Sequence, residues 1–174
     1  MFNTFKLIFT FILCFIPFMP GASWAFDYLQ PLPESAPVPA ENPLTKAKIA
    51  LGKQLFFDPT LLGPDNLLSC NSCHQLAQGG SDNKALSIGQ NGKMTRRSTP
   101  SLWNIGLQTV LYWDGRSTSL EKQTLDHLRD PVISSWRSIG AIVDQRNKSA
   151  RYRDDFKKAF KDIANQENPV SGIN

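Results

Sequence analysis

Apolar residues recur at helical spacing in several stretches of the chain, and no stretch shows the sustained alternation of a strand. The first helix is expected to begin at Lys46, after the capping residue Thr45, and to end at Asp58-Pro59. Its apolar positions are Ile49, Ala50, Leu51, Leu55 and Phe56. The pattern therefore predicts one all-α domain, which we place at residues 44–165.

Further periodic stretches follow in the second half of the chain. A capping box formed by Thr118 and Glu121 predicts a helix over residues 118–129, which Pro131 ends. A short helix is expected near residues 101–105. Another helix is indicated by the spacing of Ile139, Ile142 and Val143.

The remaining segments are a terminal helix, a tail and two loops. The helix is expected over about residues 150–164, with an apolar face of Tyr152, Phe156, Ala159, Phe160 and Ile163. Residues 166–174 are expected to fray. Loops are predicted at residues 60–69 and 76–100, and a loop as long as the second is often functional. Turns within it are marked by Gly79-Gly80 and Asn91-Gly92.

The first 25 residues have the features of a secretory signal peptide. An almost purely apolar run at residues 7–18 is too short to span a bilayer as a helix. Ser23 and Ala25 are small residues at the spacing that signal peptidase reads, so we expect cleavage after Ala25 and removal of Cys14; the alternative is an uncleaved membrane anchor. Residues 26–43 are rich in proline and are expected to lie extended on the surface.

The overall composition is that of an ordinary globular protein. Of the 174 residues, 41% are hydrophobic and 20% are charged, which excludes a wholly disordered or collagen-like chain. The 19 Lys and Arg residues outnumber the 15 Asp and Glu residues, which gives a net charge of +4. Because these charges are scattered and form no patch, no nucleic-acid partner is expected.

Cys70, Cys73 and His74 form the sequence C-x-x-C-H, which is the attachment signal for c-type haem. The two thiols can each bond one vinyl group of the porphyrin, and His74 then becomes the proximal iron ligand. Export of the chain agrees with this assignment, because attachment takes place on the exported side. We therefore expect one covalent haem c per chain. The alternatives are a disulfide, a redox dithiol and a zinc site, although zinc would need two further ligands.

The sixth iron ligand separates electron transfer from peroxide chemistry. Two side chains could supply it, Met94 in the long loop and His127, the second of two histidines. His127 is expected on a solvated face, because its neighbours include the charged residues Asp126, Arg129 and Asp130. Met94 is therefore the preferred candidate.

The residues around the motif resemble the bacterial di-haem cytochrome c peroxidases and the related MauG group. The matching blocks are L-G-K-Q-L-F-F-D-P (51–59), S-C-N-S-C-H (69–74), Gly79-Gly80 with Asp82, S-I-G (87–89), R-R-S-T-P-S-L-W-N (96–104) and Y-W-D-G-R-S-T-S-L-E-K-Q (112–123). A weaker match is R-Y-R-D-D-F-K-K-A-F (151–160). Ordered blocks of this kind are far more specific than a lone C-x-x-C-H.

The resemblance implies a cytochrome-c-like haem domain in the periplasm, corresponding to the N-terminal domain of that family, whose haem reacts with hydrogen peroxide. The family's other haem domain takes electrons from a small donor protein, a cytochrome or a cupredoxin. Trp113 matches a family tryptophan between the two haems, so it is assigned to the electron path. A second haem-bearing chain, or a second copy of this chain, could stand in for the other domain.

The chain departs from the family pattern at several site positions. The family histidine that follows S-I-G and ligates the resting iron is Gln90 here. The family glutamate that helps to break the O–O bond has no counterpart, because residues 131–143 contain no acid. Ser98 stands where a family asparagine helps to hold calcium, so calcium is doubtful. Gln90 and Arg97 remain as candidates for the distal side of the haem.

Three functions are compatible with these residues. The first is a peroxidase domain, slowed by the missing glutamate because a positioned acid or base is worth about a hundred- to ten-thousandfold in rate. The second is a mono-haem electron carrier, with Met94 as sixth ligand and Lys84 and Lys93 steering an acidic partner. The third is a truncated, inactive family member. The peroxidase domain is our working hypothesis.

Overall fold

The computed structural model describes residues 30–64 and 68–161. The chain divides into two compact units, Met1–Ser35 and Ala36–Asn174. The expected signal peptide with its cleavage after Ala25, and the expected frayed tail at 166–174, lie outside the described residues. From residue 30 to residue 43 the chain contains no helix and is exposed except at Asn42, as its prolines predict.

Helices and connecting loops make up the described part of the chain. The helices are α2 (Lys46–Phe57), α3 (Cys70–Cys73), α4 (Leu120–Arg129), α5 (Ile139–Asn147) and α6 (Ala150–Ala159), with 3-10 turns at Leu76–Gln78, Gln90–Gly92 and Ile105–Leu107. Extended pairing within residues 30–64 and 68–161 is limited to two isolated bridges, Ile88 with Met94 and Leu111 with Ser117. The all-α prediction is confirmed. None of the helices in these ranges is long and apolar enough to cross a membrane.

The first helix has the ends that its sequence predicts. The Thr45 side chain accepts a hydrogen bond from the Lys48 backbone N–H at 3.2 Å, which satisfies one of the free donors of the first turn of α2. Asp58 leaves the helix with extended backbone angles, and its side chain then accepts a bond from the Thr60 N–H at 2.7 Å. The chain therefore turns away from α2 immediately after Phe57.

Two helix starts lie later than predicted, and hydrogen bonds in the segment before each helix explain the difference. Helix α4 is capped by Ser119 and not by Thr118, because the Leu111 N–H donates to the Ser117 carbonyl at 2.7 Å and keeps the chain extended until that point. The helix expected at 101–105 is instead a 3-10 turn at Ile105–Leu107. Ser101 competes with helix formation there, since its hydroxyl accepts from the Trp103 N–H at 3.1 Å.

The last helix is shorter than expected. Helix α6 ends at Ala159, whereas the apolar pattern extended it to residue 164. Phe160 has non-helical backbone angles, yet its ring remains stacked on Phe156, with 6.2 Å between ring centroids, and under the Lys48 ammonium at 5.1 Å. The spacing of the aromatic residues therefore indicated which side chains pack together, although Phe160 lies past the end of α6.

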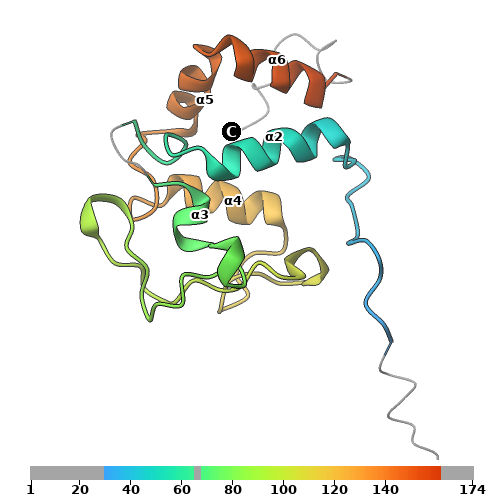
Figure 1. Cartoon of the computed structure of the whole chain (residues 1–174), viewed down its shortest axis with the longest axis vertical. Coiled ribbons are helices and arrows are strands. Elements are labelled where there is room, and N and C mark those ends of the chain that lie inside the picture. Colours follow the sequence, from blue (N-terminus) through green and yellow to red (C-terminus); the bar gives the residue numbers. More distant parts are fainter. Residues whose placement is uncertain (1–29, 65–67, 162–174) are drawn as a thin grey trace, which may run out of the picture. The chain divides into compact units, whose positions relative to one another are not determined.

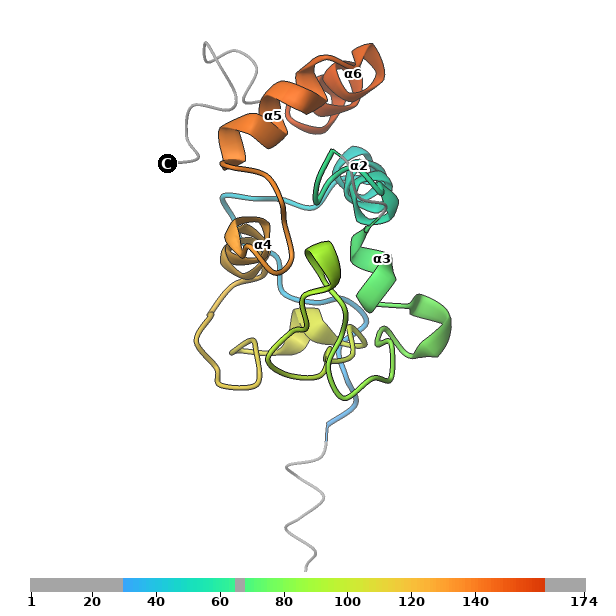
Figure 2. The same cartoon turned by 90° about the vertical axis from the view of Figure 1, so that its left-hand side faces the viewer.

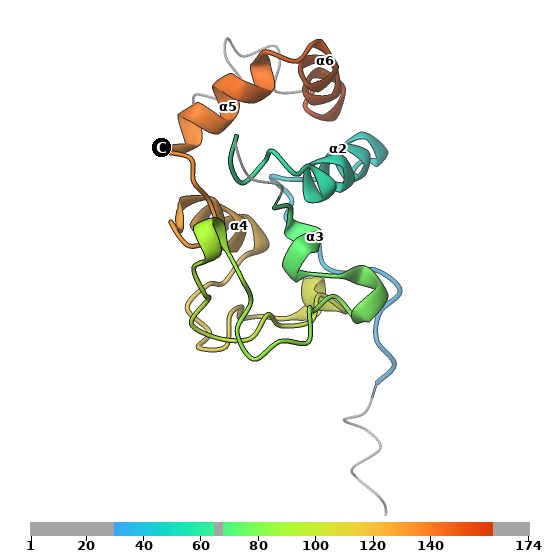
Figure 3. The ribbon, with the colours of Figure 1, turned by 60° about the vertical axis from the view of Figure 1, so that its left-hand side comes forward.

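Helix α6 packs against α2 and α5, and α3 packs against α2 (Figure 1, Figure 2 and Figure 3). The loops between α3 and α4, drawn from green to yellow, lie on the side of α2 away from α6 in all three views. Fully buried apolar residues in the described ranges are few: Leu51, Leu61, Leu62, Leu111, Ile142 and Ala159. Much of the apolar surface of the loops is therefore not covered by the chain itself.

Candidate functional site

The cysteines lie on the single turn of α3. Ser69 precedes this turn, and its backbone N–H donates to the Ser72 hydroxyl at 3.0 Å, which helps to fix the start of the turn. Cys70 and Cys73 are both half-buried free thiols and do not form a disulfide. Burial raises the pKa of both thiols, and the nearby Asp82 charge raises that of Cys73 further. Two neutral thiols one helical turn apart are thus presented on the same side of the turn.

His74 directly follows this turn, and its ring orientation is fixed by a backbone carbonyl. Nδ1 of His74 lies 3.0 Å from the Gly80 carbonyl oxygen. A carbonyl only accepts, so Nδ1 carries the proton and Nε2 keeps its lone pair. Burial lowers the pKa of His74, the Gly80 bond opposes this, and the charge of His127 lowers the pKa further. His74 is thus a neutral imidazole whose Nε2 is available to a metal.

The Gly79-Gly80 turn brings this carbonyl to the histidine. Gly80 has φ +77°, and a Cβ there would lie 2.7 Å from the Leu102 backbone nitrogen. Only glycine combines this left-handed angle with so close a contact. The sequence marked the turn, but it gave no indication that the turn supplies the acceptor for His74.

The residues around α3 fit a haem better than a zinc ion. Within residues 30–64 and 68–161 there is no group of three or more His, Cys, Asp or Glu side chains that could hold a metal ion. The loops that follow α3 instead expose large apolar side chains: Leu76, Ile88, Met94, Trp103, Val110 and Trp113. Paired thiols, an oriented imidazole and uncovered apolar surface suit a flat apolar porphyrin bonded through its edge.

Tyr112 and His127 form a second ordered pair. Their rings are parallel to within 3°, with centroids 5.3 Å apart, and the Arg116 guanidinium lies 3.3 Å from the centroid of the tyrosine ring. The Tyr112 hydroxyl is 3.0 Å from Nδ1 of His127. His127 is half-buried, so the expectation of a solvated face was wrong. Its charged neighbours on α4 occupy other faces of the helix, while His127 packs against the loop before it.

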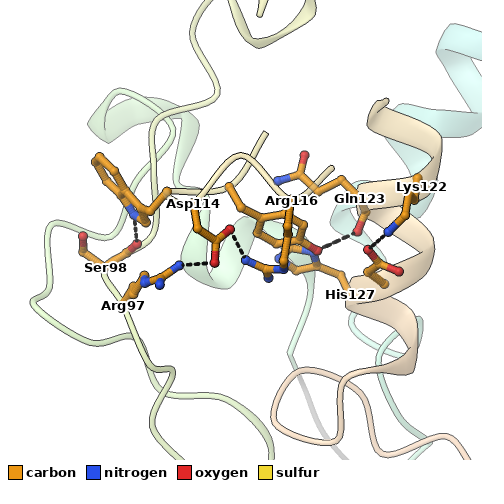
Figure 4. A network of polar contacts seen from close by, with 10 residues as sticks. Arg97, Ser98, Asp114, Arg116, Lys122, Gln123 and His127 are labelled. Atoms are coloured by element: carbon orange, nitrogen blue, oxygen red, sulfur yellow. Dashed lines mark hydrogen bonds and ion pairs between the residues drawn. The ribbon is translucent and has the colours of Figure 1, made fainter. Parts of the chain in front are cut away.

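Arg97 and Trp113 lie in the same network, at the surface. Asp114 pairs with Arg97 at 2.7 Å and with Arg116 at 2.8 Å (Figure 4). Hydrogen bonds from these two guanidinium groups hold the pKa of the Asp114 carboxyl well below its usual range. The Trp113 indole N–H donates to the Ser98 carbonyl at 2.9 Å, and its side chain is largely exposed. Trp113 therefore presents an anchored aromatic ring at the surface.

Gln90 lies elsewhere, in a buried cluster of loops. Its Nε2 donates to the Leu62 carbonyl at 2.9 Å, and its backbone N–H donates to the Val132 carbonyl at 2.7 Å. Its Oε1 is buried and has no hydrogen-bond partner within the described residues. Gln90 thus adjoins the segment where the family glutamate is missing. It shares no hydrogen-bond partner with Arg97, so the two candidates for the distal side are not joined by these contacts.

Met94, the preferred candidate for the sixth ligand, is 58% exposed.

The described part of the chain has helices and no strands, and these helices surround a C-x-x-C-H turn with an oriented histidine, which defines a cytochrome-c-like domain. The family profile described as di-haem cytochrome c peroxidase matches residues 46–174. The chain belongs to this family of haem peroxidase-like oxidoreductases.

Individual relatives agree with this assignment. A cytochrome-c peroxidase IdrP1 of Denitromonas iodatirespirans is 46% identical over 79% of this chain and 35% of its own length. A cytochrome c551 peroxidase of Pseudomonas aeruginosa is 34% identical over 75% of this chain and 37% of its own length. The methylamine utilization protein MauG of Methylorubrum extorquens is 38% identical over 74% of this chain and 36% of its own length. The chain thus spans about a third of the length of these relatives.

Solved structures show the same likeness. A MauG-like protein associated with microbial copper homeostasis superposes with a TM-score of 0.70 and 33% identity, over 86% of this chain and 43% of that one. The di-haem peroxidase BthA of Burkholderia thailandensis superposes with a TM-score of 0.60 and 25% identity, over 68% of this chain and 33% of that one. The cytochrome-c-like fold expected from the motif blocks is confirmed.

Proposed function

We propose that this chain is an exported haem c domain that reduces hydrogen peroxide to water with electrons from a small donor protein. The observation that carries the proposal is the Nδ1 bond from His74 to the Gly80 carbonyl, which aims a neutral imidazole beside two free thiols in a chain of the peroxidase family. When bound, the haem supplies the iron that reacts with peroxide and stores oxidising equivalents. The balance is one peroxide, two electrons and two protons to two water molecules.

The residues of the α3 turn would hold the haem. Each thiol, from Cys70 and from Cys73, would add across one vinyl C=C bond of the porphyrin. The sulfur would bond to one carbon and the thiol hydrogen would end on the other, so attachment would need no oxidant. His74 would coordinate through Nε2, and Gly80 would keep its ring from turning.

On the distal side of the proposed haem, the chain lacks the acid or base that a fast peroxidase uses. Gln90 can donate or accept a hydrogen bond through its amide, but it cannot act as an acid or base at neutral pH. Arg97 is held by Asp114 at the surface. We therefore propose slow turnover, assisted by a second haem-bearing chain or a second copy that docks beside Trp113. A mono-haem electron carrier is the second candidate, favoured by this lack of a distal acid.

The test is to produce the full chain in a periplasm that has haem-attachment machinery. Denatured protein should retain a haem band, and the Cys70→Ala and Cys73→Ala variants should lose one thioether each. Asn71→Ala, within the same turn, is the matched control. Mixing the oxidised and the reduced protein with peroxide, with donor present, should consume peroxide in proportion to the donor electrons supplied. Haem that washes out on denaturation would refute the attachment, and peroxide left unconsumed would leave the electron carrier.

A further inference from the structure

His127 has one ring nitrogen occupied and one ring nitrogen free. Nδ1 lies 3.0 Å from the Gln123 carbonyl of its own helix and 3.0 Å from the Tyr112 hydroxyl, which is itself 3.2 Å from that carbonyl. A bare Nδ1 would face the carbonyl lone pair to lone pair, so the arrangement favours a proton on Nδ1. Within the described residues Nε2 of His127 makes no hydrogen bond. Nε2 therefore carries an unused lone pair.

The backbone of Tyr112 is strained in the position that supports this ring. Its φ is +67°, in the left-handed region that a bulky residue seldom adopts, at a typical cost of about 1–3 kcal/mol. The turn is held by the Leu111–Ser117 bridge and by Gly115, whose N–H donates to the Tyr112 carbonyl at 3.3 Å. Strain of this kind persists only where the surrounding structure imposes it. Here it stacks the tyrosine ring on His127.

His127 belongs to α4 and His74 directly follows α3, and Figures 1, 2 and 3 draw these two helices on the same side of α2, away from α6. Burial is the main reason that the pKa of His74 is lowered and the Gly80 bond opposes it, but the charge of His127 contributes in the same direction as burial. Such an influence fades over roughly 8–10 Å at ordinary ionic strength. The placement of the two helices agrees with this influence, with one histidine on α4 and the other directly after α3. Both have Nδ1 in a hydrogen bond with a backbone carbonyl.

We infer that His127, through Nε2, is the sixth iron ligand of the resting protein, opposite His74, and that Tyr112 positions it. This inference rests on the haem proposed above. The two other candidates are less suited to the role. Met94 is 58% exposed, and the amide nitrogen of Gln90 is engaged with the Leu62 carbonyl. In the family the residue after S-I-G ligates the resting iron. In this chain that residue is Gln90, and we assign the ligand role to His127 on α4 instead.

With His127 as sixth ligand, the resting iron would have no open position for peroxide. Peroxide would need His127 to leave, and the bonds from Nδ1 to Gln123 and Tyr112 hold the ring in place. Only the fraction of molecules with His127 displaced would bind an external ligand, so the apparent affinity is reduced by that fraction. Removal of the imidazole should therefore open the site and not inactivate it.

The experiment compares optical and electron paramagnetic resonance spectra of the ferric holoprotein in four forms. Wild type should be low-spin with two imidazole ligands. His127→Ala should be high-spin, should regain the low-spin spectrum when free imidazole is added, and should bind cyanide about tenfold or more tightly. Thr124→Ala, an exposed position on the same helix, is the matched control and should resemble wild type. Met94→Leu should also keep the low-spin spectrum.

Each other outcome has a definite meaning. A high-spin wild-type spectrum, or a low-spin spectrum that survives in His127→Ala, would overturn the inference while the covalent haem band still supported the proposed function. Loss of the low-spin spectrum in Met94→Leu alone would assign the ligand to the loop. Absence of covalent haem in wild type would reject the proposed function itself. Because imidazole rescue requires a folded pocket, it also separates a missing ligand from a failure to fold.

Discussion

Arg146 on α5 reaches back to the carboxylate of Asp58, which ends α2, and the two form an ion pair that is almost entirely buried. Their side chains are 6% and 11% exposed. The pair is embedded in further bonds: Tyr152 donates its hydroxyl to Asp58 at 2.5 Å, and Arg146 donates to the Thr60 hydroxyl at 2.8 Å. This cluster joins the end of α2 to α5 and α6 through polar contacts, beside the buried apolar residues Leu51, Ile142 and Ala159 of the same helices.

Breaking this pair should be costly. Because removal of one partner leaves a buried charge uncompensated, Asp58→Asn should lower the free energy of unfolding by about 3 kcal/mol. Arg151→Ala is the control, since Arg151 is 77% exposed and 3.9 Å from Asp155, and it should change the free energy of unfolding by less than about 1 kcal/mol. Urea denaturation of the holoprotein measures both. Equal effects of the two substitutions would contradict the role of the buried pair.

The same cluster should make stability fall in acid. Burial alone would raise the pKa of Asp58, but the bonds from Tyr152 and Thr60 and the charge of Arg146 lower it below 3.8. The charged form therefore stabilises the fold above about pH 3.8, and this contribution is lost as the pH falls through the lower folded-state value. Denaturation midpoints measured from pH 6 to pH 2 should decline at the acid end. The decline should be smaller in Asp58→Asn.

A side chain at position 80 should disturb both the turn and the histidine. Gly80→Ala would impose a left-handed alanine whose Cβ lies 2.7 Å from the Leu102 nitrogen, and it should cost about 1–3 kcal/mol. It should also loosen His74, which would appear as a changed reduction potential and iron spectrum of the holoprotein. Gly52→Ala in α2 is the contrasting control. With nothing within 4 Å of its Cβ, it should stabilise the protein by about 0.5–1 kcal/mol.

Trp113 should matter for electron delivery more than for haem binding. Its ring is 64% exposed and anchored by the bond to the Ser98 carbonyl, so Trp113→Phe removes an indole at the surface with little effect on the fold. We expect unchanged haem content and slower reduction of the haem by a donor protein. Trp103→Phe, at a similarly exposed tryptophan, is the control. If both variants are reduced at the wild-type rate, neither indole lies on the electron path.

The pattern of the sequence was sufficient for α2, where the determinants are local. Thr45 and Asp58-Pro59 set both ends of this helix. The assignment of the C-x-x-C-H residues to haem stays a prediction, made from an equally local motif. The predicted start of a helix was wrong where a neighbouring hydrogen bond favours a different capping residue. Ser119 replaced Thr118 as a cap because the Leu111–Ser117 bridge, formed across a turn, delays the helix.

The Tyr112–His127 pair was missed for a related reason. Charged neighbours predict exposure of a helix position only on average, and the loop that covers His127 is fixed by a strained tyrosine and by a glycine turn. The aromatic residue at position 112 and the histidine fifteen positions later were visible as residue types. Nothing in their spacing showed that they stack, because the loop between them has no periodicity.

The bond from His74 to Gly80 also bears on the order of assembly. It joins residues only six positions apart, next to the two cysteines, so the whole thiol and imidazole set is contained in one short stretch. Closing a loop of that size takes on the order of 10–100 ns and involves no distant part of the chain. His127, by contrast, must be brought in from another helix at a larger entropic cost. If the chain is exported as proposed, it therefore already contains the complete proximal half before it folds, and a haem bonded there would act as the nucleus on which the remaining helices condense.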